Sequence, residues 1–250
     1  MKKQELAKDI IHYRFDPRPG KIFDTSATAI LNGKKAILID TGYESQTPLL
    51  LEDLAKNDIE VEAVILTHFH DDHMEGLKLL PGIPIYGSGH YQEILDLWIA
   101  KEDHSYFLPS VIINEPFLLS YGDHHLTLTP HPGHSACGTL ISINNQFLHV
   151  GDEIIFTADG VPLLPIVDDI TKDAKVHLES LNKLRDYGKF TIIPSHGPVF
   201  DGKDLINDIE NRCAYLKALL NSNKVISFED ATKNCTYNFV NNGWHEGNCR

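Results

Sequence analysis

Short apolar runs separated by turn residues predict a chain rich in strands, with amphipathic helices between them. In the first half the expected strands are residues 10–15, 27–31, 35–39, 63–67 and 83–87. The expected helices there are residues 47–56, 71–80 and 91–100. Asn32-Gly33 is a strong signal for a two-residue hairpin turn. Thr47 as cap, with Pro48 in the first helical position, predicts the start of the first helix.

The second half continues the same pattern. Its expected strands are residues 125–129, 138–143, 147–150 and 190–194, and its expected helices are residues 171–187 and 204–220. Residues 101–121 show no clean period, which predicts either a lid or pocket wall or a plain connecting loop. Residues 221–250 are polar and rich in Asn, and we expect them to be an appendage to a main domain of residues 1–220. Two strand-rich halves, each with helices, indicate an α/β (α+β) fold of two facing sheets with helices outside.

The apolar run Ala63–Leu66 leads directly into three histidines and two aspartates. Such a run is typical of a buried strand in a parallel sheet, and open α/β sheets bind ligands at the carboxyl ends of these strands. His68 and His70 are two residues apart, so they point to the same side of an extended backbone. Asp71 predicts a helix N-cap, which places the next two residues in the first turn. The potential metal ligands brought together in this way are His68, His70, Asp72 and His73.

A lone histidine is usually a surface residue or a hydrogen-bonded core residue. The pattern H-x-H-x-D-H after an apolar strand is different, because clustered buried charges and imidazoles are costly unless they are paired or bind a cation. We therefore expect a metal site here.

Composition limits the partners of this site. The chain has 250 residues and a mass of 28.1 kDa, which suits one substantial domain. The net charge is −13 and no Lys/Arg-rich run of five or more occurs, which argues against a nucleic-acid partner. No apolar stretch is long enough to span a bilayer, so we expect no membrane partner. Residues 1–9 lack the apolar segment of a signal peptide, and the cysteines form no C-x-x-C pair, which together predict reduced thiols and a cytoplasmic location.

Three later strand ends also finish in a ligand-type residue within a turn that contains glycine. These residues are His134 after Pro132-Gly133, Asp152 after Gly151, and His196 before Gly197. Each alone is a weak indication of a metal ligand. Together with the central cluster they supply five histidines and two aspartates, enough for two metal ions with room for water.

These motifs, in this order, resemble those of the metallo-β-lactamase superfamily of metallohydrolases. The resemblance covers residues 10–220 through Asp40-Thr41-Gly42, the H-x-H-x-D-H run, His134, Asp152 and His196. It implies a four-layer αββα sandwich with the metals at one edge of the sheets. The implied ligands are His68, His70 and His134 for one metal and Asp72, His73 and His196 for the other, with Asp152 bridging both. Asp40 matches a position that supports the site without binding metal.

Departures from better-known members leave the subfamily open. The carboxylate of Asp152 differs from the true β-lactamases, which makes β-lactam hydrolysis a less favoured alternative. His70 stands where flavodiiron reductases carry an acidic residue, and Ile155 stands where acyl-homoserine lactonases place a tyrosine. The short chain after His196 holds one clear helix, whereas glyoxalase II carries a helical glutathione-binding domain there.

The expected activity is metal-dependent hydrolysis of an ester, thioester or lactone-type bond of a small molecule. Two divalent ions that share a water lower its pKa from about 15.7 to about 7, and the resulting bridging hydroxide would attack the carbonyl, or a phosphoryl, centre. We expect Asp72 and Asp152 to accept protons as well as bind metal, and His131 is a candidate general acid, with solvent exposure as the alternative. Residues 156–165 either line the substrate pocket or form a structural loop.

Imidazole and carboxylate ligands suit Zn²⁺, and Mn²⁺ or Fe accept the same set. One rival function is an iron-dependent oxygenase similar to persulfide dioxygenases, which use one iron. The other is a non-catalytic binding protein that keeps the fold.

Overall fold

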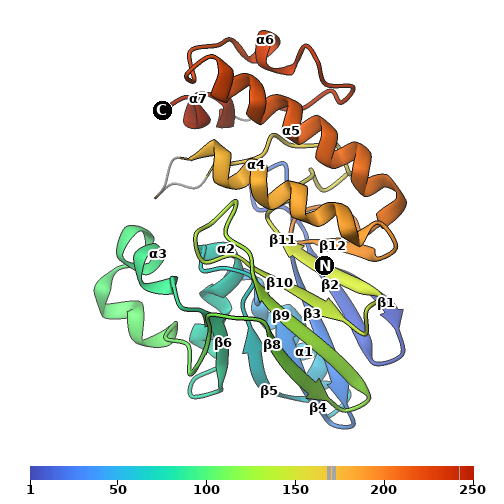
Figure 1. The fold of residues 1–250 in the computed structure, drawn as a ribbon. Coiled ribbons are helices and arrows are strands. Elements are labelled where there is room, and N and C mark those ends of the chain that lie inside the picture. Colours follow the sequence, from blue (N-terminus) through green and yellow to red (C-terminus); the bar gives the residue numbers. More distant parts are fainter. Residues whose placement is uncertain (168–169, 171–172, 242) are drawn as a thin grey trace.

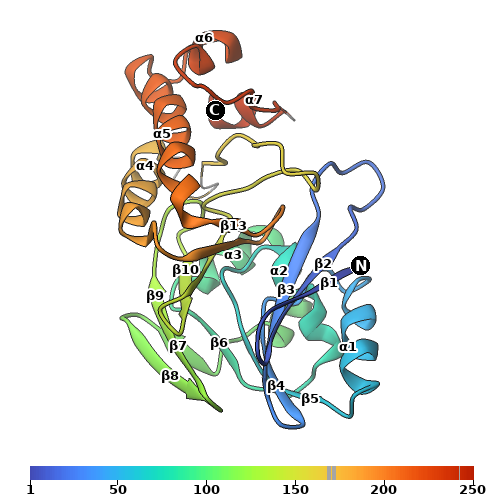
Figure 2. The same ribbon diagram turned by 90° about the vertical axis from the view of Figure 1, so that its right-hand side faces the viewer.

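The computed structural model describes residues 1–167, 170, 173–241 and 243–250. Two β-sheets pack face to face and helices cover both outer faces (Figure 1). Turning the molecule by 90° shows the layers edge on, with α1 outside one sheet and α4 and α5 outside the other (Figure 2). The expected α/β (α+β) class and αββα sandwich are confirmed.

The first sheet has the order β1-β2-β3-β4-β5-β6-β7. Its strands are β1 (Lys2–Ala7), β2 (Ile10–Phe15), β3 (Thr25–Asn32), β4 (Lys35–Ile39), β5 (Glu60–Ile65), β6 (Ile85–Ser88) and β7 (Val111–Ile113). Strands β1 to β4 are antiparallel and β4 to β7 are parallel. The expected hairpin joins β3 and β4, but its turn is one residue later than expected: Asn32 pairs with Lys35, and Gly33 takes the positive φ of 63° that glycine adopts readily.

The second sheet has the order β13-β12-β11-β10-β9-β8. Its strands are β8 (Phe117–Tyr121), β9 (His124–Pro130), β10 (Thr139–Ile143), β11 (Phe147–Gly151), β12 (Thr191–Pro194) and β13 (Phe200–Asp201). Strands β11 and β12 are parallel, and the other neighbours are antiparallel.

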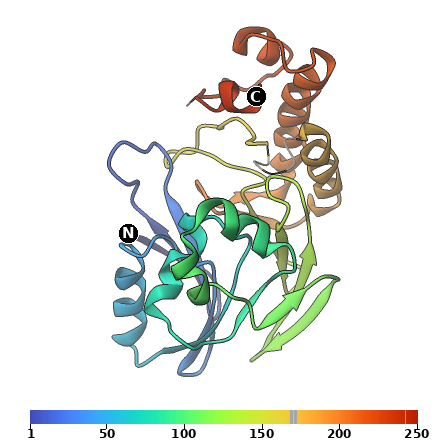
Figure 3. The same ribbon diagram turned by 90° about the vertical axis from the view of Figure 1, so that its left-hand side faces the viewer.

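The helices lie outside the sheets or at their edges. The α-helices are α1 (Thr47–Ala55), α2 (Asp71–Met74), α3 (Tyr91–Trp98), α4 (Ala174–Lys183), α5 (Leu205–Asn221), α6 (Phe228–Thr232) and α7 (Trp244–Asn248). The 3-10 helices are η1 (Glu75–Leu79), η2 (Lys101–Tyr106), η3 (Leu184–Tyr187) and η4 (Gly202–Asp204). Figure 3 shows α5 together with the short red helices of the carboxyl-terminal segment at one end of the molecule, away from α1 at the other end.

Alternation of side chains along the strands builds three apolar layers. In β4, Leu38 packs with α1 and α3, whereas Ile37 and Ile39 lie between the two sheets. Outside the second sheet, α4 and α5 cover β11 and β12 with residues such as Leu181 and Leu216. Because these strands are covered on both faces, their sequences are mostly apolar, and His149 of β11 is a fully buried polar exception.

Several predictions about individual elements were wrong in detail. Strand β1 was missed because it is an exposed, charged edge strand without apolar alternation. Residues 101–121 are not a plain loop; they contain η2, β7 and β8, whose short, partly exposed strands give no clean period. Thr47 is the first residue of α1 rather than its cap, and its hydroxyl donates to the Thr41 and Tyr43 carbonyls.

The helix after the central cluster is also shorter than expected. His70, rather than Asp71, is the N-cap of α2, which ends at Met74 and continues as the 3-10 helix η1 to Leu79. The first two residues of the expected helix 171–187 lie outside the described residues; α4 begins at Ala174, and η3 follows it to Tyr187.

The carboxyl-terminal segment, residues 221–250, packs onto α5. Ala231 and Phe239 are buried in the same apolar cluster as Leu216. The Tyr215 hydroxyl donates to Nδ1 of His245 at 3.0 Å, and Nε2 of His245 donates to the Ile226 carbonyl. The division into residues 1–220 and an appendage stays a prediction. Within the described ranges, every helix is too short or too polar to cross a membrane.

Candidate metal centre

The seven expected ligands all lie where strands end at one edge of the two sheets. The positions are His68 and His70 after β5, Asp72 and His73 in α2, His134 after β9, Asp152 after β11, and His196 after β12. Strands β11 and β12 are parallel, and β9 runs in the same direction as β11 because both pair antiparallel with β10. Their carboxyl ends therefore meet at the same edge, which is where such sheets bind ligands.

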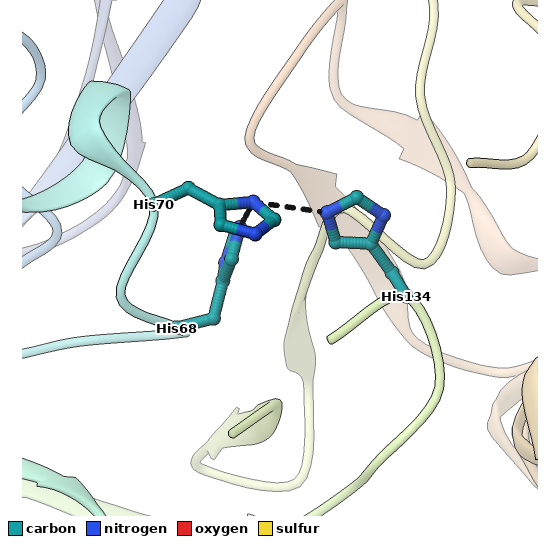
Figure 4. Close-up of side chains that lie close together, drawn as sticks. All are labelled: His68, His70 and His134. Atoms are coloured by element: carbon teal, nitrogen blue, oxygen red, sulfur yellow. Dashed lines mark hydrogen bonds between the residues drawn. The ribbon is translucent and has the colours of Figure 1, made fainter. Parts of the chain in front are cut away.

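One ligand group consists of three imidazoles, His68, His70 and His134. Figure 4 shows the rings converging from two separate segments of the chain. The Nδ1 atom of His70 lies 2.9 Å from Nε2 of His68 and 3.2 Å from Nε2 of His134. Each residue offers one nitrogen within 4.8 Å of the other two, so a single cation can reach all three.

The second group consists of Asp72, His73 and His196. Nε2 of His73 lies 3.5 Å from a carboxylate oxygen of Asp72, and Nε2 of His196 lies 3.3 Å from its other oxygen.

The Asp152 carboxylate lies between the two groups. Its Oδ2 atom is 3.0 Å from Nε2 of His196, 3.7 Å from Nε2 of His134 and 4.0 Å from Nε2 of His68. Its Oδ1 atom is 3.5 Å from Nε2 of His73. One carboxylate thus faces histidines of both groups.

Hydrogen bonds on the far side of three rings orient them for metal binding. Nδ1 of His73 donates to Asp40, Nδ1 of His134 to the Ile166 carbonyl and Nδ1 of His196 to the Asp24 carbonyl. A ring that donates through Nδ1 presents the Nε2 lone pair, and Nε2 is the atom that each of these rings directs into the site. The neighbouring main-chain and carboxylate acceptors therefore select the metal-binding tautomer.

Asp40 connects several parts of the site. It is fully buried and accepts hydrogen bonds from the Thr67 amide and hydroxyl, both at 2.8 Å, and from His73 at 2.9 Å. Its φ of 56° lies in the left-handed region, which Asp tolerates better than most residues. The structure therefore gives Asp40 contacts that suit the supporting role expected from its motif.

The pKa values of the ligand histidines His68 and His70 are lowered, whereas those of His73 and His196 are raised. Burial lowers the pKa of His68 well below its ordinary value and that of His70 to about 4, so both are neutral at pH 7, the form that binds metal. Burial acts in the same direction on His196, but the charges of Asp152 and then Asp72 outweigh it and raise its pKa to about 9. The same carboxylates raise the pKa of His73 well above its ordinary value. The carboxylates thus favour positive charge beside them, which a divalent cation provides.

Two buried polar atoms without a hydrogen bond to any described residue are a further indication that these residues fit a metal ion. Nε2 of His73 and Oδ1 of Asp152 are buried and make no hydrogen bond within the described part of the chain. Unpaired buried polar atoms are costly, and a cation between them would satisfy both. The donor set of imidazole nitrogens and carboxylate oxygens suits Zn²⁺, with Mn²⁺ or Fe as alternatives.

A cavity of about 400 Å³ opens next to these ligands. Its walls combine ligand residues with side chains from distant segments, and the residues that are not ligands include Lys21, Phe23, Tyr43, Asp71, Trp98, Ile155, Ile166, Val167, Trp244 and Asn248. This size is typical of small-molecule sites. Residues 156–165 do not line it, so the structural-loop alternative holds for them.

His131 does not occupy the position expected of a general acid. It is 4% exposed and absent from the cavity walls, and its Nε2 atom lies 3.8 Å from Glu153. Neither the general-acid prediction nor the alternative of solvent exposure matches this position.

Glu153 is a supporting residue that sequence reasoning missed. It is buried, and its carboxylate accepts hydrogen bonds from the His134 amide at 2.8 Å and from the Ser180 hydroxyl. Burial raises its pKa to about 7. Its position directly after Asp152 was the available signal, since an acidic residue at a buried strand end needs partners.

Comparisons with known protein sequences bear on the family of this chain. A sequence profile described as the metallo-beta-lactamase superfamily matches residues 20–196. The chain is 25% identical over 195 residues to the Beta-lactamase-like protein 2 homolog of Caenorhabditis elegans, covering 74% of this chain and 60% of that protein. It is 23% identical over 180 residues to a hydroxyacylglutathione hydrolase of Haemophilus ducreyi, covering 69% of this chain and 66% of that protein. The chain therefore spans less than two thirds of the length of these relatives.

Solved structures show the same fold at low identity. A metallo-beta-lactamase from Pontibacter korlensis superposes with a TM-score of 0.67 at 19% identity, covering 86% of this chain and 98% of that one. The DIM-1 metallo-beta-lactamase superposes with a TM-score of 0.64 at 18% identity, covering 84% and 96%. These identities support the fold alone. Because the profile covers well over half of the sequence, the chain belongs to the metallo-beta-lactamase superfamily.

Proposed function

We propose that this protein is a binuclear metal-dependent hydrolase that cleaves an ester, thioester or lactone-type bond of a small molecule. The observation that carries the proposal is the place of Asp152, whose carboxylate faces histidines of both ligand groups. In this proposal His68, His70 and His134 hold one ion, Asp72, His73 and His196 hold the other, and Asp152 contacts both.

Two divalent cations held in this way would lower the pKa of a shared water and polarise the carbonyl of the substrate. The chain's own residues supply position and proton transfer. His68 and His70 are neutral at pH 7 and the second group carries the carboxylates, so negative charge is concentrated on one side of the site. Asp72 and Asp152 are the carboxylates placed to accept the proton that water releases.

Among the candidate bonds, a thioester is favoured by the relatives. Several are hydroxyacylglutathione hydrolases, whose name describes hydrolysis of a hydroxyacyl thioester of glutathione. The β-lactamase structures resemble this chain in fold only and do not favour β-lactam hydrolysis in the same way.

The test is to measure bound metal and turnover on the same protein. Elemental analysis of the purified chain should find close to two divalent ions per chain. Metal-loaded protein should hydrolyse members of a panel of p-nitrophenyl esters, thioesters and lactones. His68→Ala and Asp152→Ala should lose metal and activity together, whereas the control Asp123→Ala, a change at a side chain that is 90% exposed, should lose neither.

Two results would contradict the proposal. Full activity in Asp152→Ala would remove the bridging carboxylate from the mechanism. One iron per chain with oxygen consumption would favour the oxygenase instead.

A further inference from the structure

Aromatic side chains flank the candidate metal centre on two sides. The Trp98 ring lies 6.4 Å from His70, on the side of the three-histidine group. On the other side, the Phe23 ring lies 4.8 Å from His196, and Trp244 lies 5.9 Å from Phe23. All three aromatic residues line the cavity, and Trp98 and Trp244 are the two tryptophans of the chain.

The two sides differ in how enclosed they are. Trp98, at the end of α3, is 54% exposed. Phe23 and Trp244 are half-buried, and Ile155 and Val167, which line the same cavity, are buried. A bound substrate therefore has an enclosed apolar end beside Phe23 and Trp244 and an open end beside Trp98.

The charged residues in the cavity walls indicate which kind of substrate group the enclosed end can bind. Among the described cavity walls, Lys21 is the one lysine or arginine. A phosphate-rich group is usually held by several basic side chains or by a helix N-terminus. The walls of this end combine that one lysine, whose Nζ lies 5.7 Å from the centre of the Phe23 ring, with aromatic and aliphatic side chains, which suit a planar apolar group that stacks or packs edge to face.

We propose that the enclosed end selects substrates with an aromatic acyl group, of the phenylacetyl type, which lies against Phe23 and Trp244. This inference rests on the proposed thioester or ester hydrolysis. In the reaction the bond between the acyl carbon and sulfur breaks, and water supplies the new carbon–oxygen bond. The proton from water leaves with the thiol, which departs past the open end beside Trp98.

The experiment uses acetyl and phenylacetyl thioesters of the same small thiol, so that the leaving group is constant. The metal-loaded protein should show a kcat/KM for the phenylacetyl thioester at least about tenfold above that for the acetyl thioester. Trp244→Leu and Phe23→Leu keep apolar bulk and should each lower that ratio by roughly three- to tenfold. The control Tyr106→Leu changes an aromatic residue that is 44% exposed and outside the cavity walls, and it should leave the ratio unchanged.

A binding measurement gives a second readout. Phenylacetate, the expected product, should change the tryptophan fluorescence of the metal-loaded protein at lower concentration than acetate does. In Trp244→Leu the fluorescence change caused by phenylacetate should be smaller. Equal kcat/KM values for the two thioesters, or a ratio unchanged in both cavity variants, would overturn the aromatic preference while leaving the hydrolase proposal intact. Hydrolysis of neither thioester, nor of any ester or lactone, would remove the hydrolase proposal and this inference with it.

Discussion

Replacing Asp40 with Asn tests how the structure sets the tautomer of a candidate metal ligand. The Asp40 Oδ1 atom accepts from the Thr67 amide, and its Oδ2 atom accepts from the Thr67 hydroxyl and from Nδ1 of His73. Asn has the same shape and also tolerates the positive φ, so the backbone should be retained. Its single oxygen is needed by the Thr67 amide, which cannot accept, so the amide NH₂ must face His73.

An NH₂ group in that position donates to Nδ1 of His73 and forces the proton onto Nε2. Nε2 is the atom that faces Asp72 and Asp152, so a proton there blocks metal binding by this ring. Loss of one charge-assisted buried hydrogen bond costs about 1.5–3 kcal/mol. At about 1.4 kcal/mol per tenfold change, this corresponds to a loss of roughly ten- to a hundredfold in metal affinity.

Competition with a zinc chelator measures this loss. Asp40→Asn should release one of its two ions about ten- to a hundredfold more readily and hold the other closer to wild-type affinity, because His73 bonds Asp40 directly, whereas His68 of the three-histidine group is linked to it through the Thr67 hydroxyl. Asp58→Asn is the matched control, since Asp58 has the same φ of 56° but is exposed in a turn. Wild-type affinity for both ions in Asp40→Asn would refute the tautomer argument.

Substitutions at three other buried positions test interactions outside the ligand set. Arg212→Met should lower the free energy of unfolding by about 3–5 kcal/mol, because Asp208 would keep a buried unpaired charge; a loss below about 1 kcal/mol in urea unfolding would contradict this. Burial lowers the pKa of His12 to about 3. As the pH falls below 6.5, the unfolded chain therefore takes up a proton that the folded chain does not, and the free energy of unfolding decreases by about 1.4 kcal/mol for each pH unit. His12→Gln should show a correspondingly shallower pH dependence between pH 6.5 and 5, and identical slopes would rule this out. Glu153→Ala should weaken zinc binding about tenfold in chelator competition, whereas Glu153→Gln keeps an oxygen acceptor for the His134 amide and should bind nearly as wild type does; equal affinities in both variants would contradict a positioning role.

The order of strands and helices could be predicted largely because strands covered on both faces show continuous apolar runs. The run Ala63–Leu66 and the pair Ile192-Ile193 of β12 are examples, since both faces of each are covered. The edge strands β1 and β8 do not show such apolar runs along their length. β1 is charged and exposed. In β8 burial alternates, but the apolar Leu118 occupies a position that is 78% exposed, so the sequence itself does not alternate.

The candidate ligands were accessible to sequence reasoning for a similar local reason. Each lies in the segment that follows a strand, and strands that run in the same direction bring their ends to one edge, so these positions could be expected to meet. No comparable relation between sequence and position exists for the residues that line the cavity. Phe23, Trp98 and Trp244 come from three segments that no periodicity links, and they meet only after the two halves and the carboxyl-terminal segment have packed.

The segment that follows Asp152 links that carboxylate to the outer helices. Arg212 in α5 is fully buried and donates to the carbonyls of Ile155 and Leu163 at 2.8 and 2.7 Å. Ile155 is also a cavity wall, so the same arginine fixes a wall position three residues after the proposed bridging carboxylate. The wall position of Ile155 is therefore fixed from α5, whereas the main chain beside Phe23 is fixed by the ligand His196, whose Nδ1 donates to the Asp24 carbonyl. Changes in Phe23 or Trp244 can alter the acyl group that binds while the strand ends continue to position the metal ligands.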